Sequence, residues 1–400
     1  MSLIKIYNGT VITPYRTIRE GTILLRDGKI LEVTDKNVEA EGATAINARG
    51  MYISPGFIDI HVHGGGGHDF MDNTVEAFLG IARAHARYGT TSLMPTTLSC
   101  EKEDLLKTLS VYEEANVLNK AGAGFIGIHI EGPYFSMNQK GAQDPRYIRY
   151  PDPEEYREII AYSASVKRWS AAPELPGALP FGEFLRSKGI LPAIAHTDAI
   201  YEEVLEAYEK GFVHATHFYS CMSGVSRRNA YRFAGVVESA YLLDGMTVEI
   251  IADGVHLPAS LLKLVYKIKG ADRIALITDA MRGAGMPPGK SILGSLKDGV
   301  EVIVEDGVAK LPDRSAFAGS VATGDILVRN MVRLADVPLA DAIKMSSETP
   351  ASIMGIADKK GSLVKGKDAD VIIFDEDIRI DTTIVNGEIV YPASELTISN

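Results

Sequence analysis

Cysteine is scarce in this sequence, with 2 residues among 400. Cys100 and Cys221 stand far apart and form no CxxC pair, which excludes a disulfide framework and a zinc ribbon and favours a reducing, cytoplasmic location. The sequence also lacks any apolar run of about eighteen residues, the least that a membrane-spanning helix needs. Its N-terminus lacks the apolar run of a signal peptide. We therefore expect no membrane partner.

An excess of positive charge is also missing. The sequence has 41 Lys and Arg against 52 Asp and Glu, a formal net charge of -11. This balance disfavours nucleic acid as a partner, although a single Arg or Lys inside a pocket can still bind an anion. The composition, 46% hydrophobic and 23% charged, is that of a folded globular protein.

The two ends of the chain resemble each other and differ from the middle. Residues 1–54 and 358–400 contain short segments of alternating apolar and polar residues around NG and DG turn signals. The sequence IYNGTVI near the start is similar to IVNGEIVY near the end. Because lone edge strands are unstable, we predict that both segments pair into one small β-sandwich.

The middle segment, residues 55–357, alternates short apolar runs with helical stretches, the pattern of βα units around parallel strands. Eight such runs occur, from GFIDIHVHG to RIALITDAM. Eight βα units favour an α/β fold of the (β/α)8 TIM-like barrel type, with its active site at the carboxyl ends of the strands. An open doubly wound sheet is the alternative.

Histidines gather at the predicted strand ends. Five of the nine lie there, namely His61, His63, His196, His217 and His256. His61 and His63 point to the same side of their strand because side chains alternate, and Glu131 ends another strand. One histidine at a strand end is more often structural than a metal ligand. The set with Glu131 predicts a site for a divalent metal such as Zn²⁺ or Fe²⁺.

An aspartate ends the eighth run. Asp279 lies in LITDAM, where it could simply cap the next helix. Opposite a metal site, it is better placed to take a proton from the attacking water and to deliver it to the leaving group. We therefore interpret Asp279 as the catalytic residue.

Several motifs together resemble one known family. The segments HVHGGGGHDFMD, HIEGP followed by QKGAQDP, AHTDA, ADGVH and LITDAM are similar to those of the N-acetylglucosamine-6-phosphate deacetylases of the amidohydrolase superfamily. The resemblance runs through the whole chain. It implies that Glu131, His196 and His217 hold one metal ion, and that His61 and His63 hold a second with Glu131 bridging. Zinc is the expected metal, with iron and manganese as alternatives, and the expected assembly is a homodimer.

The resemblance also implies a substrate site, from which this sequence departs in places. His256 corresponds to a residue that contacts the substrate. Ser220 and Cys221 stand where the family has Asn-Ala, and Arg228 matches a phosphate-binding arginine but lacks the usual Pro-Gly after it. Gln143 replaces a histidine that polarises the amide carbonyl; a glutamine can donate a hydrogen bond but cannot carry positive charge.

The resulting functional hypothesis is hydrolysis of the acetamido group of an amino-sugar phosphate, with N-acetylglucosamine-6-phosphate as the expected substrate. An amidohydrolase acting on another amide is the alternative, for example on N-acetylgalactosamine-6-phosphate, an N-acyl amino acid or a cyclic amide. A barrel protein without catalysis is a more distant one. The sequence leaves the sugar epimer, the need for phosphate and the native metal open.

Overall fold

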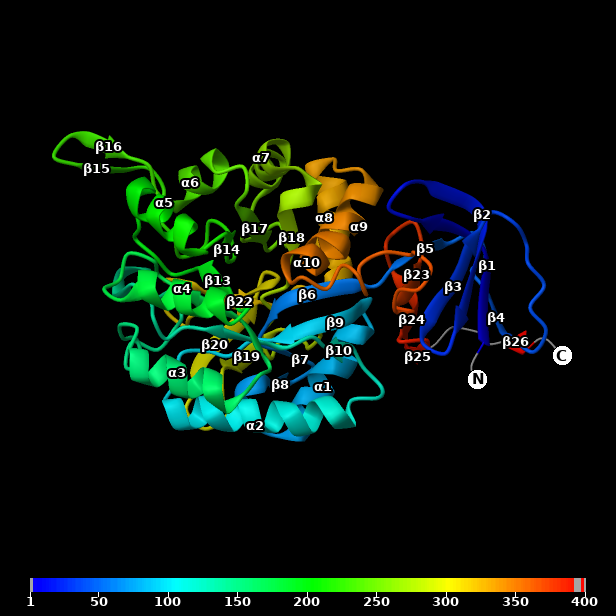
Figure 1. Cartoon of the computed structure of the whole chain (residues 1–400), viewed down its shortest axis with the longest axis horizontal. Coiled ribbons are helices and arrows are strands. Elements are labelled where there is room, and N and C mark those ends of the chain that lie inside the picture. Colours follow the sequence, from blue (N-terminus) through cyan, green and yellow to red (C-terminus); the bar gives the residue numbers. More distant parts are fainter. Residues whose placement is uncertain (1–2, 392–396, 399–400) are drawn as a thin grey trace.

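The computed structural model describes residues 3–391 and 397–398. Residues 1–2, 392–396 and 399–400, which the two predicted terminal segments include, lie outside the described residues. A larger α/β part lies beside a smaller part made of strands from the start and the end of the chain (Figure 1). Within the described ranges, no helix is both long and apolar enough to cross a bilayer.

The smaller part is a nine-stranded sheet that contains strands from both ends of the chain. Its strands are β1 (Leu3–Ile12), β2 (Thr17–Arg26), β3 (Lys29–Thr34), β4 (Thr44–Asn47), β5 (Tyr52–Pro55), β23 (Val371–Phe374), β24 (Ile380–Val385), β25 (Glu388–Tyr391) and β26 (Thr397–Ile398). The order is β25-β24-β23-β5-β1-β2-β3, with β4 beside β1 and β26 beside β4. Antiparallel pairing of β5 with β23 places Ile53 opposite Ile373, and both side chains are fully buried.

The larger part is built on parallel strands. They are β6 (Phe57–Val62), β9 (Thr90–Pro95), β10 (Gly124–Phe125), β11 (Ile128–Glu131), β12 (Val166–Ala171), β13 (Leu191–Ile194), β14 (His214–Ala215), β17 (Thr247–Ile250) and β18 (Ile274–Leu276). One sheet has the order β10-β9-β6 and the other β11-β12-β13-β14-β17-β18. Parallel bridges Thr96↔His129 and Val62↔Ala280 connect the two sheets at their carboxyl ends. Each of the eight predicted runs overlaps at least one of these nine strands, and the third contains both β10 and β11, so the predicted α/β class is confirmed.

Helices follow the parallel strands and pack on their outer side (Figure 1). They are α1 (Val75–Ala86), α2 (Lys102–Leu118), α3 (Pro153–Tyr162), α4 (Ala178–Ser187), α5 (Tyr201–Lys210), α6 (Val236–Leu242), α7 (Ala259–Lys269), α8 (Gly324–Ala335), α9 (Leu339–Ser346) and α10 (Glu348–Ile353). Their ends follow local chemistry. The Thr74 hydroxyl caps α1 by accepting a hydrogen bond from the Ala77 N–H, and Gly211 ends α5 with a φ of 114°.

Two antiparallel additions flank the parallel strands. The sheet formed by β19 (Gly289–Leu293), β20 (Val300–Glu305), β21 (Val308–Lys310) and β22 (Phe317–Ser320) follows β18, and a parallel bridge Ala280↔Ser320 brings it to the end of that strand. The hairpin of β15 (Ser226–Arg228) and β16 (Tyr231–Phe233) extends away from the body of the molecule (Figure 1). The first addition lies close to the strand ends, where the predicted site residues gather.

The packing of the terminal sheet gives a stability prediction. Ile373→Ala should lower the free energy of unfolding by about 2–5 kcal/mol, because it removes a fully buried side chain opposite Ile53 and leaves a cavity. Urea denaturation followed by circular dichroism measures this change. Glu376→Ala, an exposed position just after the same strand, is the matched control and should have little effect. Equal stability of both variants would contradict the buried pairing.

Candidate metal centre

Six predicted residues lie at the carboxyl ends of the parallel strands and face one another. His61 and His63 lie at the end of β6, Glu131 ends β11, and His196, His217 and Asp279 follow β13, β14 and β18. All six are at most 8% exposed. Residues far apart in the chain therefore meet because parallel strands end at the same edge of their sheet.

These side chains form two groups of possible ligands, His61 with His63 and Asp279, and Glu131 with His196 and His217. In the first group, the Nε2 atoms of the two histidines are 3.3 Å apart, and Asp279 Oδ1 lies 3.5 and 3.2 Å from them. In the second group, His196 and His217 Nε2 are 3.2 Å apart, and Glu131 Oε1 lies 3.5 and 3.0 Å from them.

These distances fit a bound divalent ion. Ligand bonds of about 2.1 Å in a tetrahedral site place neighbouring ligand atoms about 3.4 Å apart. Two imidazole nitrogens that face each other can share one proton at most, so a cation between them satisfies both. Both groups have imidazole and carboxylate donors, the set that suits Zn²⁺ and similar ions. Each group therefore has the donors and the spacing to hold a metal.

Glu131 connects the two groups. Its Oε1 also lies 3.5 Å from His61 Nε2, and its Oε2 lies 3.4 Å from His63 Nε2. Oε1 thus lies close to histidines of both groups, while Oε2 faces the first group alone. The two groups contain one further carboxylate, Asp279. It lies within 3.5 Å of His61 and His63, which belong to its own group, whereas Glu131 lies within 3.5 Å of histidines of both groups.

The electrostatics of the centre favour positive charge between the side chains. Burial alone would raise the pKa of Glu131, but His61 and then His196 and His217 outweigh it and hold this pKa well below its usual value. Burial lowers the pKa of His63, yet the carboxylates of Asp279 and Glu131 outweigh burial and raise it to about 9. Ionised carboxylates in a buried cluster require a compensating cation, either protons on the histidines or a metal ion.

The backbone is strained at three of the six residues. His196, His217 and Asp279 have φ values of 47°, 27° and 47°, in the left-handed region that residues with a Cβ rarely occupy. Such conformations cost about 1–3 kcal/mol each and persist where the surrounding structure enforces them. All three occur directly beyond a strand, where the chain turns sharply and directs the side chain across the strand ends. Strain of this kind is typical of functional sites.

A buried acid below the centre supports the histidines. Glu249 on β17 is fully buried; its Oε2 lies 3.2 Å from His61 Nδ1 and accepts a hydrogen bond from the His217 N–H at 3.1 Å. Its other oxygen accepts a hydrogen bond from Arg168, which is also fully buried and donates to Thr216 Oγ1 at 2.7 Å. A carboxylate at Nδ1 keeps the proton there, so His61 presents an unprotonated Nε2 to a metal.

Sequence reasoning missed Glu249 and Arg168. A signal existed for Glu249, a charged residue between the apolar Val248 and Ile250 of a buried strand, whereas Arg168 follows another charged residue, Lys167, and did not stand out. His214 belongs to the same buried layer, with Nε2 3.4 Å from Glu249 Oε1. His129 packs edge-on against His61 and shares hydrogen bonds with Thr96 and Ser170.

A cavity of about 290 Å³ opens above the ligands. Its lining includes four of the five predicted substrate residues, namely Gln143, Ser220, Cys221 and His256. Phe317 on β22 and Leu293 on β19 form part of its wall, so the added antiparallel sheet completes the site. Arg228, the fifth, is absent from this lining: it lies exposed on the projecting hairpin, with its guanidinium over the Phe233 ring.

Gln143 is held firmly at the edge of the centre. Its Nε2 donates to Glu131 Oε2 at 2.8 Å, and its Oε1 accepts from the Ser99 N–H at 2.9 Å. The loop that carries it approaches the cavity closely because residue 141 is glycine, where a Cβ would lie 2.6 Å from Cys221 Sγ. An amide has two N–H donors, so Gln143 can bind Glu131 and still donate to a substrate oxygen.

Buried histidines and carboxylates at the ends of parallel strands, below an open cavity, make up the site of a metal-dependent hydrolase. Residues 52–390 match the model of the amidohydrolase family. The chain is 35% identical over 391 residues to an N-acetylglucosamine-6-phosphate deacetylase from Lysinibacillus sphaericus, covering 97% of this chain and 98% of that protein. It is 33% identical to an N-acetylgalactosamine-6-phosphate deacetylase from Escherichia coli O157:H7, covering 84% and 87%.

Solved structures are also similar to this chain over nearly its whole length. The N-acetylglucosamine-6-phosphate deacetylase from Pasteurella multocida matches with a TM-score of 0.90 and 28% identity, covering 97% of this chain and 99% of that one. The enzyme from Mycobacterium smegmatis matches with a TM-score of 0.89 and 29% identity, covering 98% and 100%. The chain belongs to the amidohydrolase family and, within it, to the N-acetylglucosamine-6-phosphate deacetylases, as its motifs predicted.

The buried support gives a prediction for Glu249. Glu249→Gln should lower the free energy of unfolding by about 3–5 kcal/mol, because it leaves the buried Arg168 charge uncompensated. It should also weaken metal binding by His61 and His63 by about 10–100-fold. Chemical denaturation and metal titration of the dialysed protein measure these two effects. Glu301→Gln, which removes an exposed ion pair with Lys290, is the matched control; an equally small effect at Glu249 would contradict the support role.

The two thiols give a second prediction. Burial raises the pKa of Cys221, but His196 beside it outweighs burial and lowers that pKa, whereas burial and Asp104 raise the pKa of Cys100 to about 12. Because the thiolate is the reactive form, iodoacetamide at neutral pH should modify Cys221 of the metal-free protein much faster than Cys100. Peptide mass spectrometry over time measures both rates. Faster labelling of Cys100 would contradict this account.

Proposed function

We propose that this chain hydrolyses the acetamido group of N-acetylglucosamine-6-phosphate to glucosamine-6-phosphate and acetate. The observation that carries the proposal is the meeting of two ligand groups, one of which contains Asp279, below a cavity lined by His256 and Gln143. Curated relatives with this activity in their names align over nearly the whole chain, which supports the same substrate here.

We propose two divalent ions per chain, zinc with iron or manganese as alternatives. His196 and His217 would hold one ion and His61 and His63 the other, with Glu131 between them; the ligand spacing supports this arrangement. Bound there, divalent ions polarise the amide carbonyl as Lewis acids and bring the pKa of water down to about 7. The remaining steps belong to side chains of the chain itself.

Asp279 would move the proton. Its Oδ1 lies among the ligand atoms at the floor of the cavity, and the positive environment of His61 and His63 keeps its pKa low despite burial. In our mechanism it accepts a proton from the attacking water and delivers it to the sugar nitrogen as the C–N bond breaks. Gln143 would donate its second N–H to the carbonyl oxygen, which gains negative charge during attack.

The other lining residues would bind the sugar. His256 donates from Nδ1 to Asp253 Oδ2 at 2.7 Å, which leaves Nε2 as an acceptor for a sugar hydroxyl. Ser220 and Cys221 lie on the same loop and would contact the sugar phosphate in place of the Asn-Ala that is usual in the family. Arg228 would bind phosphate from the projecting hairpin; because it is not part of the lining of the cavity in its own chain, it would reach the site of a second copy in a homodimer.

The strand pairing supports a more detailed description of the fold. We propose that the two parallel sheets, joined by the bridges Thr96↔His129 and Val62↔Ala280, form a closed (β/α)8 barrel over residues 55–357. The enzyme would act in the cytoplasm. Residues 1–54 and 358–400 would form a β-sandwich beside the barrel. The shared nine-stranded sheet supports this pairing of the two ends.

A second candidate substrate is N-acetylgalactosamine-6-phosphate, favoured by the similarity to the Escherichia coli enzyme of that name. Acetate release by metal-replete protein should be measured with the N-acetylated 6-phosphates of glucosamine, galactosamine and mannosamine and with unphosphorylated N-acetylglucosamine. Turnover of N-acetylglucosamine-6-phosphate well above the other sugars is expected. No hydrolysis of any sugar by the metal-bound protein would refute the proposal and direct attention to other small amides.

Asp279 provides the mechanistic test. Asp279→Asn should lower kcat by about 10²–10⁴-fold, because an amide cannot take up the proton. The ion held by Glu131, His196 and His217 should remain, as measured by metal analysis, while the group that contains Asp279 should bind metal more weakly. Asp306→Asn, an exposed position on the hairpin between β20 and β21, is the control. Wild-type turnover by Asp279→Asn would exclude the assigned role.

A further inference from the structure

A carboxylate outside the metal centre organises the loop beside it. Asp198 lies two residues after the ligand His196, and its side chain accepts three hydrogen bonds from other side chains. The donors are Ser136 Oγ at 2.9 Å, Asn138 Nδ2 at 3.0 Å and Gln139 Nε2 at 2.6 Å. All three donors belong to the loop that follows β11, the strand that ends in Glu131. None of the steps proposed above uses Asp198.

The same loop holds the ring of His196. The carbonyl oxygen of Gln139 lies 2.7 Å from His196 Nδ1, and the Ser136 N–H donates to the His196 carbonyl at 2.9 Å. Because a carbonyl can only accept, His196 carries a proton on Nδ1 and presents an unprotonated Nε2 to a metal. The orientation of this ligand therefore depends on the position of Gln139, which Asp198 holds by its side chain.

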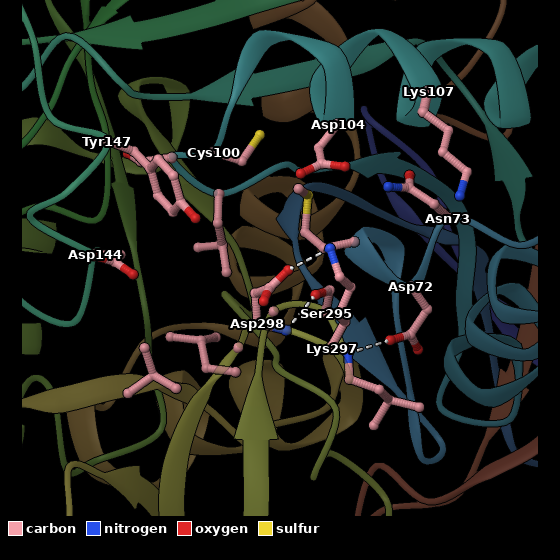
Figure 2. Close-up of a pocket in the computed structure, with 18 of the residues that line it drawn as sticks. Asp72, Asn73, Cys100, Asp104, Lys107, Asp144, Tyr147, Ser295, Lys297 and Asp298 are labelled. Atoms are coloured by element: carbon pink, nitrogen blue, oxygen red, sulfur yellow. Dashed lines mark hydrogen bonds and ion pairs between the residues drawn. The ribbon is translucent and has the colours of Figure 1, made fainter.

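Close packing does not fix the rest of this loop, because cavities lie on both sides of it. Ala142 and Gln143 line the cavity above the metal centre and also a second cavity of about 390 Å³. Asp144 and Tyr147, from the same segment, lie along one side of that second cavity (Figure 2). A segment with open space on two sides lacks the dense contacts that hold a core residue. Polar anchors, Asp198 at its start and Gln143 at its end, must therefore set its position.

The turn that carries Asp198 is itself fixed by neighbouring loops. Glu174, which follows β12, accepts hydrogen bonds from Thr197 Oγ1 at 2.6 Å and from the Asp198 N–H at 2.7 Å. The Thr197 N–H donates to the Cys221 carbonyl at 3.0 Å, and the Ser223 N–H donates to the Thr197 carbonyl at 3.1 Å. Asp198 is thus a fixed point from which the adjoining loop is held.

We propose that Asp198 is a positioning residue of the metal centre. It belongs to neither group of ligands, but it fixes the Gln139 carbonyl that orients His196. Through the same loop it sets the place of Gln143, which donates to Glu131. The expected effect on turnover rests on the proposed function, whereas the expected effect on metal binding does not.

Removal of the carboxylate tests this role. Asparagine has one oxygen in place of two and alanine has none, so Asp198→Asn loses at least one of the three hydrogen bonds and Asp198→Ala loses all of them. Titration of the dialysed protein with Co²⁺, followed by visible absorption, reports affinity and ligand geometry together. We expect Asp198→Ala to bind at least one Co²⁺ equivalent about 10-fold more weakly than the wild type, with Asp198→Asn in between. The kcat for N-acetylglucosamine-6-phosphate should fall in the same order.

Two donors of the loop separate positioning of the ligand from general support. Gln139 binds Asp198 and also supplies the carbonyl to His196, whereas no hydrogen bond joins Asn138 to His196 among the described residues. Gln139→Ala should weaken Co²⁺ binding and should add little in the Asp198→Ala background, because both changes break one connection. Asn138→Ala should leave Co²⁺ affinity within about twofold of wild type. Gln139→Ala keeps the test decisive if the Asp198 variants fold poorly by circular dichroism.

Asp375→Asn is the matched control for lost stability. Asp375 is half-buried like Asp198, and it accepts the N–H groups of Asp377 and Arg379 in a loop of the terminal sheet. This variant should bind Co²⁺ as the wild type does. Wild-type Co²⁺ affinity and spectrum in folded Asp198→Ala, or an equal loss in Asp375→Asn, would overturn the inference. Weakened Co²⁺ binding by Asp198→Ala, beside a wild type that hydrolyses no sugar, would support the inference and refute the proposed function instead.

Discussion

The charge of one buried carboxylate, Glu131, determines the arrangement of the site. Its side chain is 2% exposed and lies within 3.5 Å of four imidazole nitrogens, those of His61, His63, His196 and His217. A charge withdrawn from water is tolerated only where partners compensate it. Three strand ends besides its own must therefore direct histidines toward one point, and the left-handed backbone at His196 and His217 is part of what achieves this.

A second layer below the strand ends keeps the imidazoles in position. Glu249 contacts the His61 ring and the His217 backbone, and Arg168 compensates its charge. A buried ion pair of this kind contributes little net stability compared with an apolar pair, because desolvation offsets the attraction. The Arg168–Glu249 pair instead holds the surrounding side chains in position. The contact with His61 Nδ1 orients that ring and the hydrogen bond from the His217 N–H holds its backbone, so the distances among the six side chains depend on a polar layer that does not itself face the cavity.

The sequence predicted that histidines and acids meet at the ends of the parallel strands, for a clear physical reason. Alternation along a strand and the common edge of parallel strands are local rules, so His61, His63 and Glu131 could be placed together without coordinates. Partners distant in sequence could not be predicted in this way. Arg168 and Glu249 lie 81 residues apart, and nothing in the residues next to them specifies that they meet. The spacing of Arg228 likewise says nothing about the direction of the hairpin that carries it.

Chemistry and specificity reside in different parts of this structure. The ligands and Asp279 belong to strand ends, which the surrounding layers hold in place, whereas Leu98, Ala142 and Leu293 belong to loops and to the added sheet. Loops can vary without moving the strands that they connect. Gln143 is the exception, because its side chain lines the cavity and also hydrogen-bonds to Glu131. A change at that position would alter the hydrogen bonding of Glu131 and the lining of the cavity together.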